Sequence, residues 1–167
     1  MAEKKALEIL KNAILLEKRG RAYYSQVADN TGSDAVRQFF QMMADEEKQH
    51  EQILAEQFRH YQESGKFMAR DYADLSSSGV DAKVLTGQLK EQIAAAGFEA
   101  AAIAAAMALE KNAIELYGQR ARDAADPEEK ALYEWLRDWE KTHLDLLAQT
   151  DRELTEGVWF DNSFWPF

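Results

Sequence analysis

The chain carries the same polar interruption twice, at positions where a helix would be expected to present only apolar residues to a core. Between Val36 and Leu54, residues at helical spacing form an apolar stripe, but Glu47 and His50 fall on that stripe. Glu140 and His143 repeat the pair 93 residues later. Buried carboxylates are unfavourable unless their charge is compensated. The fold must therefore bring these groups to something that balances them.

The two interrupted stripes belong to a longer internal repeat. "LLEKRGRAYY" (15–24) aligns with "ALEKNAIELY" (108–117), and "DEEKQHEQILA" (45–55) aligns with "DWEKTHLDLLA" (138–148). The offset is 93 residues throughout, without a gap. We interpret the pattern as a duplicated helical hairpin.

Periodicity and capping residues predict an all-α fold. Helices are expected at about residues 3–28, 34–63, 98–124 and 127–156. Ser33 is the predicted N-cap of the second helix, and Asp126 followed by Pro127 is the predicted start of the fourth. A connection at about 64–97, with a shorter helix at 80–96, would join the hairpins, and an aromatic tail at 157–167 would follow. We expect one domain over residues 1–167, a four-helix bundle of two repeated hairpins with a long crossover connection.

Composition excludes several classes of function. The chain has no cysteine, so disulfides, thiolate metal sites and thiol nucleophiles are excluded. The net charge of −10 comes with scattered basic residues, which argues against nucleic acid and anionic membranes as partners. The longest apolar run, Ala100–Leu109, is too short to cross a bilayer. These features favour a cytoplasmic protein.

The spacing of four glutamates predicts that they meet at one level of the bundle. Glu17 and Glu47 lie fifteen residues on either side of Gly32, and Glu110 and Glu140 lie fifteen residues on either side of Ala125. In antiparallel hairpins, each pair then sits about 22 Å from its turn. Two divalent cations would balance four carboxylates, and two imidazoles would complete the set. The candidate metal ligands are Glu17, Glu47, His50, Glu110, Glu140 and His143.

The ligand types favour iron. Carboxylates and imidazoles without sulfur suit iron and manganese, and zinc could occupy the site artificially. Tyr24 and Tyr117 each follow a candidate ligand by seven residues on the same helix face, so their hydroxyls are predicted to bond ligand carboxylates. Trp135 and Trp139 are expected to serve core or interface packing rather than electron transfer.

The two half-motifs, "LLEKRGRAYY…DEEKQH" and "ALEKNAIELY…DWEKTH", resemble those of rubrerythrin-type proteins of the ferritin-like superfamily. The resemblance covers about residues 3–156. It implies a ferritin-like bundle with two iron ions, in which Glu47 and Glu140 bridge the metals and each histidine binds one of them. Rubrerythrins typically reduce hydrogen peroxide and take electrons from a rubredoxin module.

This chain departs from the rubrerythrin pattern in two ways. It lacks the cysteines of a rubredoxin module, so the resemblance implies a separate electron donor. It also lacks the extra glutamate usual after the ligand on the third long helix, because the next carboxylate after Glu110 is Glu115, off the ligand face. The site therefore resembles a symmetric six-ligand type.

The sequence thus favours a di-iron oxidoreductase that reduces hydrogen peroxide or dioxygen with electrons from an external donor protein. A homo-oligomer, with a dimer favoured, is expected. The alternatives are an iron-handling ferroxidase or storage protein, a manganese catalase-like enzyme, and a bundle whose buried polar cluster is only structural.

Overall fold

The computed structural model describes residues 2–73, 75, 89 and 97–161. Within them the chain forms helices α1 (Ala2–Asn30), α2 (Asp34–Ser64), α4 (Phe98–Asp123) and α5 (Pro127–Asp161). The all-α prediction is confirmed. The predicted end of the last helix at residue 156 is too early, because α5 continues to Asp161. A single glycine, Gly157, destabilises a helix by only about 1 kcal/mol and does not end it. Residues 162–167 and, apart from Leu89, the predicted helix at 80–96 lie outside the described residues.

Local signals define most helix ends. The Ser33 hydroxyl accepts a hydrogen bond from the Val36 backbone N–H at 3.3 Å, as predicted for an N-cap. At the other end of α2, Gly65 adopts a left-handed backbone (φ 68°), and its N–H donates to the Tyr61 carbonyl at 2.8 Å. Pro127 is the first residue of α5, and the Asp126 carboxylate accepts from the Glu128 N–H at 2.8 Å.

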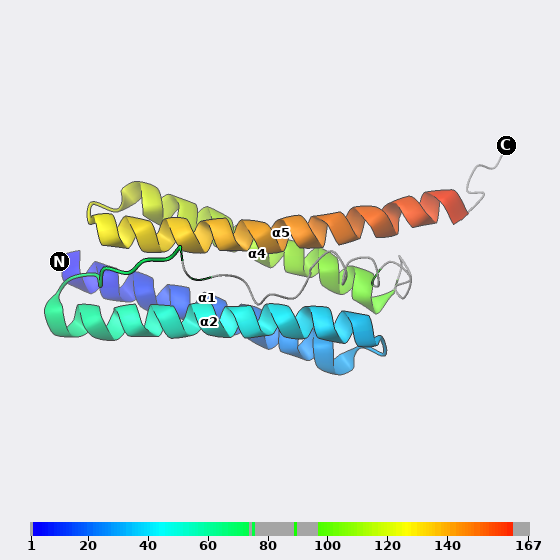
Figure 1. The fold of residues 1–167 in the computed structure, drawn as a ribbon, viewed down its shortest axis with the longest axis horizontal. Coiled ribbons are helices and arrows are strands. Elements are labelled where there is room, and N and C mark those ends of the chain that lie inside the picture. The colour runs from blue at the N-terminus through cyan, green and yellow to red at the C-terminus, as the bar shows by residue number, and fades with distance from the viewer. Residues whose placement is uncertain (1, 74, 76–88, 90–96, 162–167) are drawn as a thin grey trace.

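The four helices form an elongated bundle of two antiparallel hairpins, α1–α2 and α4–α5 (Figure 1). Helix α2 ends at the end of the bundle where α4 also ends, whereas α4 begins at the opposite end (Figure 1). The connection between the hairpins therefore has to return along the length of the bundle, which is the predicted crossover. Helices α1 and α4 run antiparallel to each other, as do α2 and α5.

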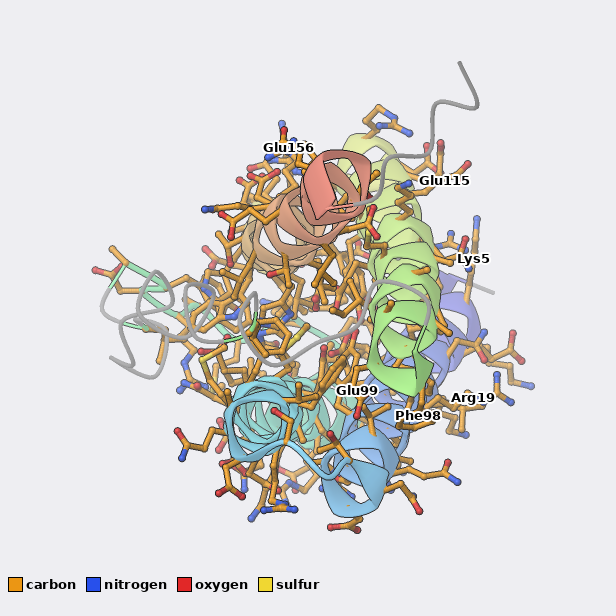
Figure 2. All side chains as sticks on the ribbon, turned by 90° about the vertical axis from the view of Figure 1, so that its right-hand side faces the viewer. Lys5, Arg19, Phe98, Glu99, Glu115 and Glu156 are labelled. Carbon is orange, nitrogen blue, oxygen red and sulfur yellow. The ribbon has the colours of Figure 1, made fainter. Side chains whose placement is uncertain are left out.

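Two apolar clusters fill the bundle, one toward each end. The first includes Val27, Phe40 and Ile103, and the second includes Leu10 and Leu136. Between these clusters, every helix contributes a buried acidic residue. Other charged side chains, such as Lys5, Arg19, Glu115 and Glu156, are exposed and point away from the bundle interior (Figure 2). None of the described helices has a stretch both long and apolar enough to cross a membrane.

Candidate metal centre

The structure brings together all six residues that the sequence singles out as metal ligands. Each helix contributes a glutamate at the middle of the bundle, and α2 and α5 each add a histidine one turn later. All six side chains are buried. They are Glu17 on α1, Glu47 and His50 on α2, Glu110 on α4, and Glu140 and His143 on α5.

The six residues form two overlapping groups, each able to hold one metal ion. One group contains Glu17 and His50, and the other contains Glu110 and His143. Glu47 and Glu140 belong to both groups. In each group the four ligand atoms lie within 4.8 Å of one another. This arrangement matches a two-metal site in which two carboxylates are shared.

The first imidazole presents its Nδ1 atom to three carboxylates. His50 Nδ1 lies 3.2 Å from Glu17 Oε2, 3.4 Å from Glu47 Oε2 and 3.1 Å from Glu140 Oε1. Because Glu17 and Glu47 come from the same hairpin and Glu140 from the other, this cluster joins the two halves of the bundle.

The second imidazole has the equivalent surroundings. His143 Nδ1 lies 3.1 Å from Glu140 Oε2, 3.6 Å from Glu47 Oε1 and 3.5 Å from Glu110 Oε1. Glu47 and Glu140 therefore direct one oxygen toward each histidine. This division of oxygens is what bridging carboxylates require, and it agrees with the roles that the family resemblance implies for these two residues.

The two predicted tyrosines reach the cluster from the opposite hairpin. The Tyr24 hydroxyl donates to Glu110 Oε1, and the Tyr117 hydroxyl donates to Glu17 Oε1. Burial, reinforced by the adjacent carboxylates, raises the pKa of both phenols well above the ordinary value. The two hydroxyls therefore keep their protons and act as donors to the non-bridging glutamates.

Burial makes the carboxyl groups of the cluster unequal. Burial and the charges of Glu47 and Glu140 raise the pKa of Glu17 well above its usual value. Burial and Glu140 raise the pKa of Glu110 to about 8. Burial would also raise the pKa of Glu140, but the charge of His50 and hydrogen bonds from both imidazoles lower it instead. In the protein without metal, burial thus favours the protonated form of the two non-bridging glutamates, whereas the imidazoles favour the ionised form of the shared glutamate on α5.

The donor set fits two divalent cations. Burial would lower the pKa of His50 and His143, but the surrounding carboxylates outweigh it and raise both values. Among the described residues no lysine or arginine forms an ion pair with the four glutamates, so the raised pKa values favour protons as the compensating charges in the protein without metal. Two divalent cations would balance four ionised carboxylates and two neutral imidazoles equally well. Such cations would replace the protons without leaving an uncompensated charge.

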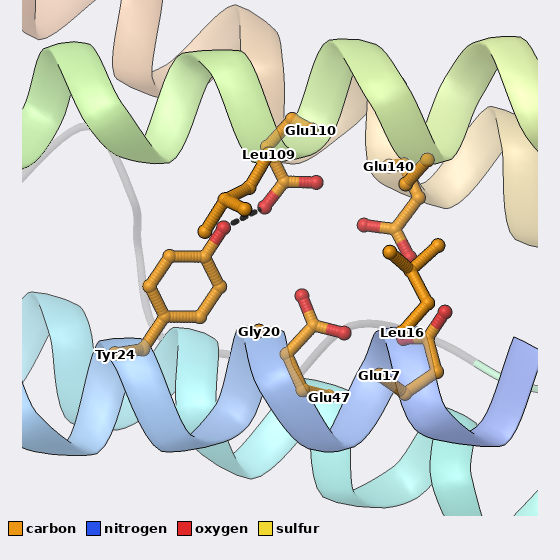
Figure 3. A pocket seen from close by; sticks show the side chains of 9 residues that line it. Leu16, Glu17, Gly20, Tyr24, Glu47, Leu109, Glu110 and Glu140 are labelled. Atoms are coloured by element: carbon orange, nitrogen blue, oxygen red, sulfur yellow. Dashed lines mark hydrogen bonds between the residues drawn. The ribbon is translucent and has the colours of Figure 1, made fainter.

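A narrow slot between α1 and α4 leads to the cluster (Figure 3). Its walls are Leu16 and Gly20 on α1 and Leu109 and Ala113 on α4, which are equivalent pairs in the repeat. The centre of a water-sized molecule has only about 20 Å³ to occupy there. That is slightly more than one water requires. A slot of this volume accommodates a water-sized or diatomic molecule.

Sequence reasoning missed one acidic residue beside the centre. Glu46 is 4% exposed, and its Oε2 atom lies 2.6 Å from His143 Nε2. The same oxygen accepts a hydrogen bond from Trp139 Nε1 at 3.0 Å. Trp139 is buried, as expected, but it also forms this polar contact. The repeat could have drawn attention to Glu46, because the equivalent position in the second hairpin carries a different type of residue, Trp139.

The predicted absence of an extra carboxylate ligand on the third long helix is consistent with the structure. Glu115 is exposed and points away from the bundle interior (Figure 2). No other glutamate of α4 is buried beside Glu110. The additional acidic residue next to the centre is instead Glu46, which comes from α2 and contacts a histidine.

Comparisons with known proteins identify the family. The family profile described as "Rubrerythrin" matches residues 8–150, a segment that contains all six candidate ligands and both tyrosines. No curated protein and no solved structure matches the chain. Because the matched segment covers most of the sequence, the chain belongs to the rubrerythrin family, whose members bind a pair of iron ions.

Proposed function

We propose that the chain is a non-haem di-iron oxidoreductase that reduces hydrogen peroxide or dioxygen with electrons from a separate donor. One observation carries the proposal: two overlapping ligand groups, sharing Glu47 and Glu140, lie at the inner end of a slot with room for little more than a water molecule. A shared pair of carboxylates supports two metal ions acting on one small molecule.

In this proposal, some of the residues would hold the metals and others would form the path for the oxidant. Glu17 and His50 would complete one metal position, and Glu110 and His143 the other. When bound, two ferrous ions would supply the two electrons that reduce hydrogen peroxide, and the external donor would restore these electrons. Reducing one hydrogen peroxide to two waters also takes up two protons.

The chain's own side chains keep protons close to the reacting molecule. The hydroxyls of Tyr24 and Tyr117 remain protonated and donate to the non-bridging glutamates, which line the slot. Protons can therefore be held at the two phenol oxygens, close to the entering oxidant, without a channel for bulk water. Leu16 and Leu109 flank the same slot and exclude larger substrates.

The test combines metal content with rapid kinetics. Protein loaded anaerobically with ferrous iron should contain close to two irons per chain, and mixing with peroxide should oxidise them faster than free ferrous iron. Glu47→Ala and Glu140→Ala should lose the iron pair, because each removes a carboxylate shared by both groups. Glu115→Ala, an exposed change on α4, is the matched control and should retain two irons.

Three results would contradict the proposal. Oxidation no faster than that of free ferrous iron would remove the catalytic role. Iron that accumulates beyond two per chain, in a large assembly seen by light scattering, would instead favour iron handling. Manganese in the purified protein, with oxygen released from peroxide, would favour a catalase-like enzyme.

A further inference from the structure

The repeat relates every ligand of the centre to a partner 93 residues away, but it fails at the outer nitrogens of the two histidines. His143 Nε2 lies 2.6 Å from a carboxylate oxygen of Glu46. His50 Nε2 is buried and has no hydrogen-bond partner among the described residues. The residue equivalent to Glu46 in the other half is Trp139, whose indole cannot accept a hydrogen bond. The Nδ1 atoms of the two imidazoles thus have equivalent surroundings, whereas their Nε2 atoms do not.

Glu46 is held firmly beside His143. Its Oε2 atom accepts from Trp139 Nε1 at 3.0 Å and faces His143 Nε2 at 2.6 Å. Both Glu46 and Trp139 are buried, at 4% and 7% exposure. Since positions 46 and 139 are equivalent, the two side chains meet where the hairpins face each other. The duplicated position is thus an acid in the first hairpin, Glu46, and a hydrogen-bond donor to that acid in the second hairpin, Trp139.

The other imidazole is covered by aromatic rings instead. The ring centres of Trp135 and Trp139 lie 5.4 Å and 5.2 Å from that of His50, and both indoles stand nearly perpendicular to it. This packing restrains the His50 ring. It offers no carboxylate or carbonyl oxygen to the Nε2 atom.

We propose that Glu46 is a positioning residue that makes the two metal positions unequal, so that the position of Glu110 and His143 binds a divalent metal more tightly than that of Glu17 and His50. A carboxylate that accepts the Nε2–H of a histidine fixes the tautomer in which Nδ1 carries the lone pair. It also increases the electron density that the ring donates to a metal. His143 receives both effects and His50 receives neither. This inference rests on the proposed metal centre.

The magnitude follows from what such outer partners contribute elsewhere. Removing the hydrogen-bond partner of a metal-binding histidine typically lowers metal affinity by about 10- to 100-fold. The two dissociation constants should therefore differ by about that factor in the wild-type protein. Glu46→Ala should weaken the tighter position until the two constants approach each other.

The experiment titrates the metal-free, full-length protein with Mn²⁺ and follows free Mn²⁺ by electron paramagnetic resonance. The wild type should show one tight and one weaker position. Glu46→Ala should lose the tight one, and Glu46→Gln, whose amide oxygen still accepts the Nε2–H, should retain part of the difference. Asp45→Asn removes a neighbouring but exposed charge on the same helix and should leave both constants unchanged.

Two single-histidine variants assign the positions. His50→Ala should retain the tight constant, and His143→Ala should retain only the weak one. Two equal constants in the wild type would overturn the inference while leaving a two-metal centre intact. Survival of the tight constant in His143→Ala would overturn the assignment. No Mn²⁺ or Fe²⁺ binding in the wild type would instead overturn the metal centre itself. The wild-type titration alone therefore decides whether the protein binds two metal ions and whether their dissociation constants differ, even if a variant does not fold.

Discussion

Replacing Gly20 with alanine should stabilise the metal-free protein and at the same time slow its reaction with peroxide. Gly20 lies in the interior of α1 and forms part of the slot wall. A Cβ atom built there would lie 3.5 Å from Glu47 Cδ and 3.7 Å from Glu47 Oε1. These are ordinary van der Waals distances, so the added methyl group fits without displacing the carboxylate.

The stability gain can be estimated from the helix alone. Glycine within a helix is less favourable than alanine by about 0.5–1 kcal/mol. In a chain of this length, 1 kcal/mol corresponds to about 2–4 °C in the midpoint of thermal unfolding. Gly20→Ala should therefore raise the midpoint of the metal-free protein by a few degrees, measured by circular dichroism.

The kinetic effect has the opposite direction. The slot offers about 20 Å³ to the centre of a water-sized molecule, and the new methyl group would occupy much of that space. Stopped-flow mixing of the ferrous protein with peroxide should give a several-fold slower oxidation, with iron content unchanged at two per chain. Ala113→Gly, at the equivalent position of the repeat, is the matched control. It should lower the unfolding midpoint without slowing oxidation.

Two outcomes would refute this reasoning. A lower unfolding midpoint for Gly20→Ala would show that the Cβ position conflicts with Glu47. An unchanged oxidation rate, with the midpoint raised as expected, would show that peroxide reaches the metals by another route.

Four further predictions concern the cluster and the core. Tyr117→Phe removes the buried hydrogen bond to Glu17 and should lower the free energy of unfolding by about 1 kcal/mol in a urea titration. Tyr133→Phe, whose buried hydroxyl has no partner among the described residues, should be neutral or stabilising. Binding two divalent cations should release protons, because metal ligation deprotonates the carboxyl and imidazole groups whose pKa values are raised, and calorimetry in buffers of different ionisation enthalpy measures this release. Because higher pH removes these protons beforehand, metal affinity should rise with pH. In the core, Leu136→Ala should destabilise the protein by about 2–5 kcal/mol in a denaturant titration, whereas Leu15→Ala at a 44% exposed position should change little.

The sequence was sufficient to predict the helices and the common height of the candidate ligands in the bundle, because both depend on spacing along the chain. Fifteen residues on each side of a turn place Glu17 and Glu47 at one height, whatever the details of packing. Capping at Ser33 and Pro127 likewise needs only near neighbours in the sequence. The end of α5 was predicted too early. A glycine often follows the last residue of a helix, but a single one such as Gly157 costs too little free energy to end it.

Glu46 could not be assigned from spacing, because its role depends on a partner in the other hairpin. Adjacent residues on a helix point about 100° apart, so Glu46 is expected to lie away from the face that carries Glu47. His143 is 97 residues distant, and only the packing of α2 beside α5 brings it to Glu46. The slot at Gly20 could not be predicted from spacing either, because its opposite wall belongs to α4 in the other hairpin.

The duplicated hairpin gives the centre two chemically different sides. Helices α2 and α5 supply both histidines, both shared glutamates and the contact between Glu46 and Trp139, and aromatic rings pack around His50 on this side. Helices α1 and α4 supply the non-bridging glutamates, the tyrosines and the slot. In the proposed function, a small oxidant entering between α1 and α4 would meet the protonated hydroxyl of Tyr24 on the side opposite the histidines. Equivalent positions differ on both sides, at 20 and 113 by one methyl group and at 46 and 139 by charge. Because these differences lie next to the ligands, we expect departures from the symmetry of the repeat to affect access to the centre at the α1–α4 side and metal affinity at the α2–α5 side.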